Sequence, residues 1–121
     1  MLNMQKFGFV FPGQGSQKAG MLNELAASHP LIKTTFAEAS AVLGEDLWQI
    51  CQDNPDGLLD QTQITQPALL TASVAIWRVW MGSTSVVPEM LAGHSLGEYS
   101  ALVCAGVLDF EAAVAMVYKR G

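Results

Sequence analysis

The amino-acid sequence predicts an α/β fold that is mostly helical and includes two short parallel strands. Two short, almost entirely apolar runs, residues 7–11 and 89–92, are typical of strands buried on both faces of a parallel sheet. Segments with the periodicity of helices lie between these runs and after the second one. Strands that alternate with helices favour a parallel sheet. Because two strands are few for such a sheet, we expect further protein to complete it.

Length and composition place residues 1–121 in a single domain and suggest that this domain is incomplete. Of the residues, 50% are hydrophobic and only 14% are charged, whereas about a quarter are charged in an average soluble domain. Such a composition leaves apolar surface uncovered in so short a chain. We expect either oligomerisation or, as we favour, a missing part of a larger protein to cover it.

Hydropathy, charge and cysteine content exclude several functional classes. No apolar run reaches the roughly 18 residues needed to cross a bilayer, and the N-terminal apolar run is too short for a signal peptide. The net charge of −5 argues against nucleic-acid binding. Cys51 and Cys104 have no CxxC spacing, so we expect neither a disulfide framework nor a metal site. A cytoplasmic location is expected.

The first half of the chain predicts helices over residues 19–28 and 30–43, because apolar residues recur there at helical spacing. A proline near the start and a glycine after the end delimit the second of these helices. Residues 46–52 add one or two further turns, and residues 53–57 read as a loop. The stripe expected to face the core consists of Ile32, Phe36, Ala39 and Leu43.

The second half predicts a buried central helix over residues 67–81, which is apolar almost all round and starts with Pro67 in the first helical position. A second buried helix is expected over residues 96–105. Asp109 is expected to cap a last helix, because a carboxylate accepts from the free N–H groups of a first turn. The predicted apolar face of that last helix consists of Phe110, Ala113, Val114 and Val117.

The turn GHSLG, residues 93–97, fits the G-x-S-x-G pattern of a nucleophile elbow. The motif falls between a predicted strand and a predicted helix, where the chain turns sharply and flanking residues must be small. Ser95 would then lie at the positive end of the helix dipole. The backbone N–H of Leu96 would meet an oxyanion formed when Ser95 attacks a carbonyl. Ser95 is the candidate nucleophile, and a structural Gly-Ser-Gly turn is the alternative.

A second glycine-rich segment, PGQGSQ, follows the first predicted strand. A dinucleotide site is disfavoured, because Lys18 stands where the third glycine of G-x-G-x-x-G is required. Loops at the carboxyl ends of parallel strands converge on one crevice, so Gln14 is expected near Ser95. Its amide would complete an oxyanion hole opposite Leu96. A glycine turn with a solvated glutamine fits the spacing equally well.

Three co-linear segments, FVFPGQGSQ, TQPALLTAS and AGHSLGEYSALVCAG, together resemble the malonyl-CoA:acyl carrier protein transacylase family and the acyltransferase domains of polyketide and fatty acid synthases. The resemblance runs from about residue 7 to the end of the chain. It implies the N-terminal portion of an α/β-hydrolase-like large subdomain, without the family's small ferredoxin-like subdomain. It also implies transfer of malonyl from malonyl-CoA to the phosphopantetheine thiol of acyl carrier protein in fatty acid biosynthesis, with no metal or redox cofactor.

The resemblance assigns a role to five residues. Ser95 matches the nucleophile that carries the acyl group as an ester, and Gln14 and Leu96 match the positions that line the oxyanion hole. Gln66 matches an active-site glutamine of the family. Arg120 matches the arginine that pairs with the free carboxylate of malonyl.

The sequence departs from the family pattern at the general base. In the family, the serine is activated by a histidine that lies well beyond the arginine in sequence, and this chain contains only His29 and His94. We expect the side chain of His94, next to Ser95, to point away from the serine proton. We expect His29 to be a surface residue that caps a helix.

Three hypotheses remain open on the sequence alone. The first is an acyltransferase, or a part of one, that uses Ser95 and that is inactive as this chain alone. The second is a serine hydrolase or thioesterase that uses the same elbow to pass acyl groups to water; Arg120 as a carboxylate partner favours the first over it. The third is a non-catalytic piece that works only with a complementary chain, as the apolar composition and the missing histidine suggest.

Overall fold

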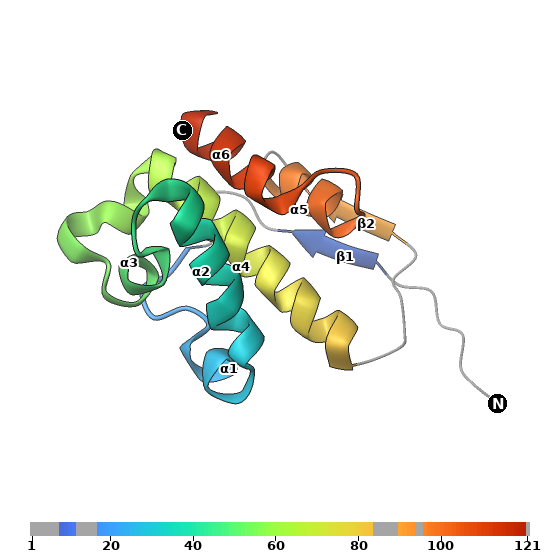
Figure 1. Cartoon of the computed structure of the whole chain (residues 1–121), viewed down its shortest axis with the longest axis horizontal. Helices are drawn as coiled ribbons and strands as arrows, with labels where there is room; N and C mark the ends of the chain where they lie inside the picture. The colour runs from blue at the N-terminus through green and yellow to red at the C-terminus, as the bar shows by residue number, and fades with distance from the viewer. Residues whose placement is uncertain (1–7, 12–16, 84–89, 94–95, 121) are drawn as a thin grey trace.

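The computed structural model describes residues 8–11, 17–83, 90–93 and 96–120, and it is mostly helical (Figure 1). In chain order the elements are β1 (Gly8–Phe11), α1 (Asn23–Ser28), α2 (Pro30–Leu43), α3 (Leu47–Asp53), the 3₁₀ helix η1 (Pro55–Asp60), α4 (Thr62–Ser83), β2 (Met90–Gly93), α5 (Leu96–Cys104) and α6 (Phe110–Arg120).

The two strands pair in parallel, with Gly8 opposite Met90 and Phe11 opposite Gly93. β1 ends at the predicted residue, and β2 lies one residue later than predicted. Parallel strands require a long crossover connection, and the helices α1 to α4 lie between them in sequence. Helix α5 packs on both strands, and α4 lies between the sheet and α2 (Figure 1).

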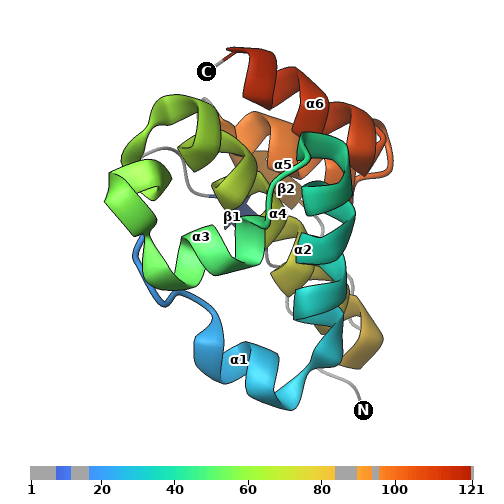
Figure 2. The same cartoon turned by 60° about the vertical axis from the view of Figure 1, so that its left-hand side comes forward.

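Helix α4 forms the centre of the core, since it packs against α2, α5 and α6. Every residue from 64 to 75 is buried, as the prediction of a central helix that is apolar all round requires. Beyond this stretch the helix becomes more exposed, and Ile76 is 42% exposed. In both views α1 and α6 lie at opposite ends of the molecule, with α4 between them (Figures 1 and 2).

A single arginine connects three of these helices. Arg78 of α4 donates from Nη1 to Oε2 of Glu38 at 2.6 Å and to Oγ1 of Thr35 at 3.2 Å, both on α2. Its guanidinium also lies over the ring of Phe110 on α6, 5.1 Å from the ring centroid. A cation over an aromatic face is attracted by the ring quadrupole, so Arg78 fixes α4 against both neighbouring helices.

Helix α2 has the predicted bounds, whereas α1 is shorter than predicted. Pro30 stands in the first turn of α2, and Gly44 ends the helix in the left-handed conformation, with φ 75°. The predicted helix over residues 19–28 begins only at Asn23. Gly20 and Leu22 have φ values of 82° and 65°, and a left-handed backbone interrupts a right-handed helix.

The start of α4 and the segment before it also differ from the prediction. Helix α4 begins at Thr62, so Pro67 is inside the helix and not in its first position. The fully buried Thr65 stabilises this extension, because its hydroxyl donates to the carbonyl of Leu59 and, at 3.0 Å, to that of Gln61. The predicted loop over residues 53–57 overlaps the 3₁₀ helix η1. Two residues of η1, Asp56 and Gly57, have positive φ and are not helical.

The cap of α6 is as predicted and gives a first test of the fold. Asp109 accepts a hydrogen bond at Oδ2 from the backbone N–H of Ala112 at 3.0 Å. Asp109→Ala is expected to lower the free energy of unfolding by about 1 kcal/mol, because it leaves a first-turn N–H without its acceptor. Urea unfolding of the chain measures this loss. Asp109→Asn keeps an acceptor and is the control; equal losses in both variants would contradict the capping role.

Candidate active site

The predicted nucleophile lies between the end of β2 and the start of α5. β2 ends at Gly93 and α5 begins at Leu96, so only residues 94 and 95 connect the strand to the helix. Ser95 and His94 lie outside the described residues; the element before them is a strand and the element after them is a helix, the order that a nucleophile elbow requires. The predicted role of Ser95 therefore has the expected structural context.

The parallel pairing places the ends of both strands, after which the two glycine-rich segments follow in sequence, at one edge of the sheet. Phe11 and Gly93 are the last residues of their strands and lie opposite each other. The chain therefore leaves both strands at neighbouring points, toward the segment that contains Gln14 and toward Ser95. Gln14 is also outside the described residues, so its predicted place in the oxyanion hole stays a prediction.

The second predicted oxyanion donor, the backbone N–H of Leu96, belongs to the N-terminus of α5. Leu96 is the first residue of the helix, and its side chain is 2% exposed. The first backbone N–H groups of a helix have no acceptor within the helix, and they carry the positive end of the helix dipole. Burial of the Leu96 side chain, together with the packing of α5 on both strands, holds this N–H in place next to Ser95.

Gln66 is buried and its side-chain oxygen is unsatisfied. The residue lies in α4, is 8% exposed, and its Oε1 accepts no hydrogen bond from the described part of the protein. A buried polar atom without a partner costs about 1–3 kcal/mol, but the hydroxyls of Thr71 and Ser100 also lack a partner among the described residues, so this feature is not specific to Gln66. Helix α4 packs against α5, and the role of Gln66 in the active site stays a prediction.

The remaining predicted residues are placed less completely. Arg120 is the last residue of α6, as the sequence suggests, and its side chain lies outside the described part. His29 connects α1 to α2 in the cap position that was predicted for it. It is the N-cap residue of α2, as predicted, and its side chain makes no capping hydrogen bond.

Neither cysteine competes with Ser95 as a nucleophile at neutral pH. Burial raises the pKa of Cys51 to about 12. Burial also raises the pKa of Cys104 to about 12, although the nearby Arg78 guanidinium acts in the opposite direction. Since the thiolate is the reactive form of cysteine, both residues stay protonated and unreactive. Both are free thiols.

Comparison with known proteins decides the family. A family profile described as the acyl transferase domain matches residues 8–121. The chain belongs to the acyl transferase domain family. A malonyl CoA-acyl carrier protein transacylase of Salmonella typhimurium is 61% identical over 118 residues, which make up 98% of this chain and 38% of that relative.

Solved structures within the acyl transferase domain family agree with the fold. An acyl carrier protein S-malonyltransferase from Vibrio cholerae superposes with a TM-score of 0.93 at 62% identity, over 96% of this chain and 38% of that chain. A malonyl-transacylase in complex with a type II PKS acyl-carrier protein gives a TM-score of 0.93 at 59% identity, again over 96% and 38%. The chain therefore spans about 38% of the length of these relatives and has part of an acyltransferase fold.

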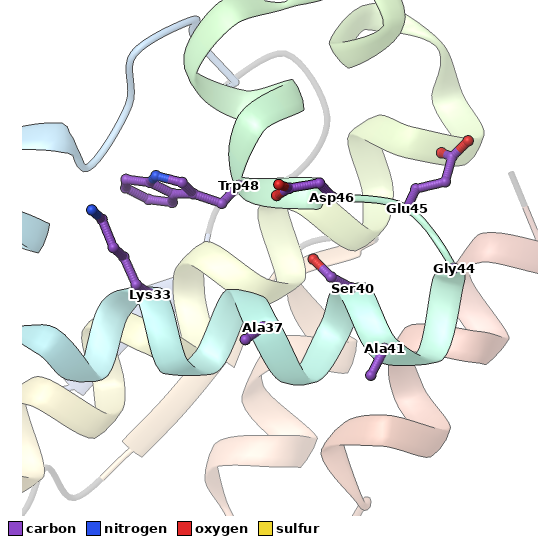
Figure 3. Close-up of a pocket in the computed structure, with 8 residues that line it drawn as sticks. All are labelled: Lys33, Ala37, Ser40, Ala41, Gly44, Glu45, Asp46 and Trp48. Atoms are coloured by element: carbon purple, nitrogen blue, oxygen red, sulfur yellow. The ribbon is translucent and has the colours of Figure 1, made fainter.

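One surface hollow of the described part contains none of the predicted site residues. It has a volume of about 570 Å³ and lies between α2 and the start of α3 (Figure 3). Lys33 and Trp48 face each other at one end, with the ammonium 5.8 Å from the ring centroid. None of its lining residues is one of the five that the acyl transferase domain resemblance assigns.

Two further observations concern the described part as a whole. None of its helices is long and apolar enough to span a bilayer. Nowhere in it do three histidine, cysteine or acidic side chains gather as a metal site would require. The hydrogen bonds that join residues 17–22 to α3 and η1 could not be predicted from local sequence patterns, because they link residues 31 to 43 positions apart.

Proposed function

We propose that this chain contributes the nucleophile and the oxyanion hole of a malonyl-CoA:acyl carrier protein transacylase. One observation carries the proposal: a two-residue connection between β2 and α5 contains Ser95, and β1 ends beside the end of β2. This is the arrangement in which a serine is exposed at the edge of a sheet with the N-terminus of a helix behind it. The family match supplies the reaction class.

The reaction proceeds in two displacements. Oγ of Ser95 attacks the thioester carbonyl of malonyl-CoA, the carbon–sulfur bond breaks, and coenzyme A leaves as the thiol with the serine proton. The malonyl group then forms an ester with Ser95. The phosphopantetheine thiol of acyl carrier protein attacks this ester, gives up its proton to Ser95 and carries the malonyl group away. Two donors, the backbone N–H of Leu96 and Gln14, stabilise the tetrahedral oxyanion that forms in each displacement.

Two further residues bind the substrate in this proposal. Arg120 pairs with the free carboxylate of malonyl, since a guanidinium fork holds both carboxylate oxygens at once. Gln66, which matches an active-site glutamine of the family, turns its amide toward the acyl group. No metal or redox cofactor takes part, and the setting is the cytoplasm.

The proposal also covers the place of the chain in a larger protein. Residues 1–121 correspond to the N-terminal part of an α/β-hydrolase-like large subdomain. A histidine outside these residues acts as the general base, as the family resemblance implies. A small ferredoxin-like subdomain would close over the serine. The 38% coverage of the relatives supports this division.

A chimera tests the proposed function. Residues 1–121 replace the matching stretch of the Salmonella typhimurium relative, to which they are 61% identical. We expect the chimera to convert malonyl-CoA and acyl carrier protein mainly to malonyl-acyl carrier protein. The 121-residue chain alone should transfer at least about 10²- to 10⁴-fold more slowly, which is the typical contribution of a general base.

Product analysis separates the alternatives in the same experiment. Free malonate as the main product of the chimera would indicate a serine hydrolase or thioesterase. A chimera that folds but neither transfers nor hydrolyses malonyl would support the non-catalytic alternative. Transfer by the isolated chain at the rate of the chimera would mean that the base lies within residues 1–121.

A further inference from the structure

Helix α4 contains a proline in its interior, directly after Gln66. The helix begins at Thr62 and includes Pro67. A proline inside a helix has no N–H to donate to the carbonyl four residues earlier, and its ring disfavours the helical conformation of the residue before it. That residue is Gln66, so the turn that contains Gln66 requires support from outside the helix.

The hydroxyl of Thr65 gives this support. It donates to the carbonyls of Leu59 and Gln61. The Gln61 carbonyl also accepts from the backbone N–H groups of Ile64 and Thr65, at 2.8 and 2.7 Å, so it is already bonded to the first turn of α4. The Leu59 carbonyl belongs to η1. The bond to Leu59 is therefore the one that joins this turn of α4 to a different element.

The acceptor of this bond is held in place on its own side. Leu59 is 1% exposed, and its backbone N–H donates to Oδ1 of Asn54 at 2.8 Å. Helix α4 packs against η1. Because Thr65 is also fully buried, water does not compete for its hydroxyl, and the loss of this donor leaves a buried carbonyl without a partner.

A second threonine of α4 shows that burial alone does not produce such a bond. Thr71 is as fully buried as Thr65, but its hydroxyl has no hydrogen-bond partner among the described residues. The bond of Thr65 therefore reflects the position of η1 and not a general property of buried threonines in this helix.

Gln66 depends on this bond through its own backbone. It is joined to Thr65 by one peptide unit, and it is buried. Without the bond, local preferences favour a helix that starts at Pro67, as the sequence alone predicts. Gln66 would then precede the helix in an extended conformation. A helical and an extended backbone direct a side chain differently, so the bond of Thr65 decides where the Gln66 amide points.

We propose that Thr65 is a positioning residue for Gln66: its hydrogen bond to the carbonyl of Leu59 keeps the turn before Pro67 helical and so sets the direction of the Gln66 amide. This role rests on the proposed function, in which that amide contacts the acyl group. Misplacing an active-site group by even 1 Å lowers the rate. The loss of the Thr65 hydroxyl should therefore lower malonyl transfer only where Gln66 is present.

Three substitutions in the chimera test the hydroxyl itself. Thr65→Val keeps the branched shape without the hydroxyl, whereas Thr65→Ser keeps the hydroxyl without the methyl group. We expect Thr65→Val to lower kcat/KM for malonyl-CoA about five- to tenfold, and Thr65→Ser to recover most of it. Thr71→Val is the matched control, because it makes the same change at an equally buried position of α4. It should leave kcat/KM within about twofold of the chimera.

A double-mutant cycle separates positioning from a loss of stability. Gln66→Ala alone should lower kcat/KM for malonyl-CoA about tenfold. In this background Thr65→Val should change kcat/KM by less than about twofold, because the amide that it positions is absent. A merely structural role of Thr65 would instead lower kcat/KM by the same factor with and without Gln66.

The outcomes distinguish this inference from the proposed function. Parental kcat/KM in Thr65→Val, or equal losses in both backgrounds, would overturn the positioning role. Should Thr65→Val fail to fold, as judged by its thermal unfolding, Thr65→Cys takes its place in both comparisons, since a thiol is only a weak donor. Parental transfer by Gln66→Ala would overturn the inference but leave Ser95 as the nucleophile. Malonyl uptake by Ser95→Ala would refute the proposed function itself.

Discussion

Ser95→Ala is expected to reduce malonyl transfer by the chimera by at least about 10³-fold. Removing a nucleophile removes the covalent route entirely, and only the weak catalysis that comes from binding and the oxyanion hole remains. Transfer from radiolabelled malonyl-CoA to acyl carrier protein measures the loss. The far-ultraviolet circular dichroism spectrum should be unchanged, because Ser95 lies in a short connection between two elements.

A second serine provides the control for this experiment. Ser100 is fully buried on α5, and its hydroxyl has no hydrogen-bond partner in the described part of the protein. Ser100→Ala removes an unsatisfied polar group and should leave both folding and transfer close to those of the parent. Losses of the same size in Ser95→Ala and Ser100→Ala would assign Ser95 to the structural Gly-Ser-Gly turn.

Arg120→Ala is expected to change which acyl group the chimera accepts. A malonyl carboxylate that is buried near the serine without a partner is costly, so malonyl transfer should fall by about 10²-fold or more. Acetyl has no carboxylate, and its transfer should fall much less or even rise. Initial rates with malonyl-CoA and acetyl-CoA, measured in parallel, give the ratio.

A purely structural role for Arg120 predicts a different pattern. Arg120 is the last residue of α6, where a cation interacts favourably with the helix dipole by about 0.3–1 kcal/mol. Loss of that interaction would lower malonyl and acetyl transfer equally. Lys119→Ala removes the neighbouring exposed cation and controls for the dipole, and it should leave the malonyl-to-acetyl ratio unchanged.

Residues that start or end a helix predicted the bounds of α2 and the start of α6. The proline and glycine at the ends of α2, and Asp109 before α6, act within one turn of the residues they affect. The buried face of α6 was predicted in full, because its residues recur at helical spacing along one amphipathic segment. Such features depend on neighbours in sequence, which a single sequence displays.

Contacts between distant segments explain the errors. Helix α4 begins before Pro67, at Thr62, where Thr65 bonds to carbonyls of the preceding segment. Helix propensity alone would place the proline at the start of the helix. Helix α1 starts late because α3 holds the residues before it in a left-handed conformation. No local pattern marks Gln52 as the donor to Met21, since 31 positions separate them.

For the candidate site, the sequence predicts a location, whereas Ser95, Gln14 and the side chain of Arg120 lie outside the described residues. The position of Ser95 between a strand and a helix follows from one short motif, and the common edge of the two strands follows from their parallel pairing. The roles of Gln66 and Arg120 came only from the resemblance. The burial of Gln66 and its unsatisfied oxygen are properties of the folded protein that its sequence does not display.

The most direct test of the account is the location of the malonyl group in the covalent intermediate. The chimera is incubated briefly with malonyl-CoA in the absence of acyl carrier protein, digested with a protease at low pH, and analysed by tandem mass spectrometry. We predict one malonyl group, attached as an ester to Ser95 in the peptide that contains GHSLG, and no such group in Ser95→Ala. A malonyl group attached to Cys51, Cys104 or any residue other than Ser95 would contradict the assignment of the nucleophile.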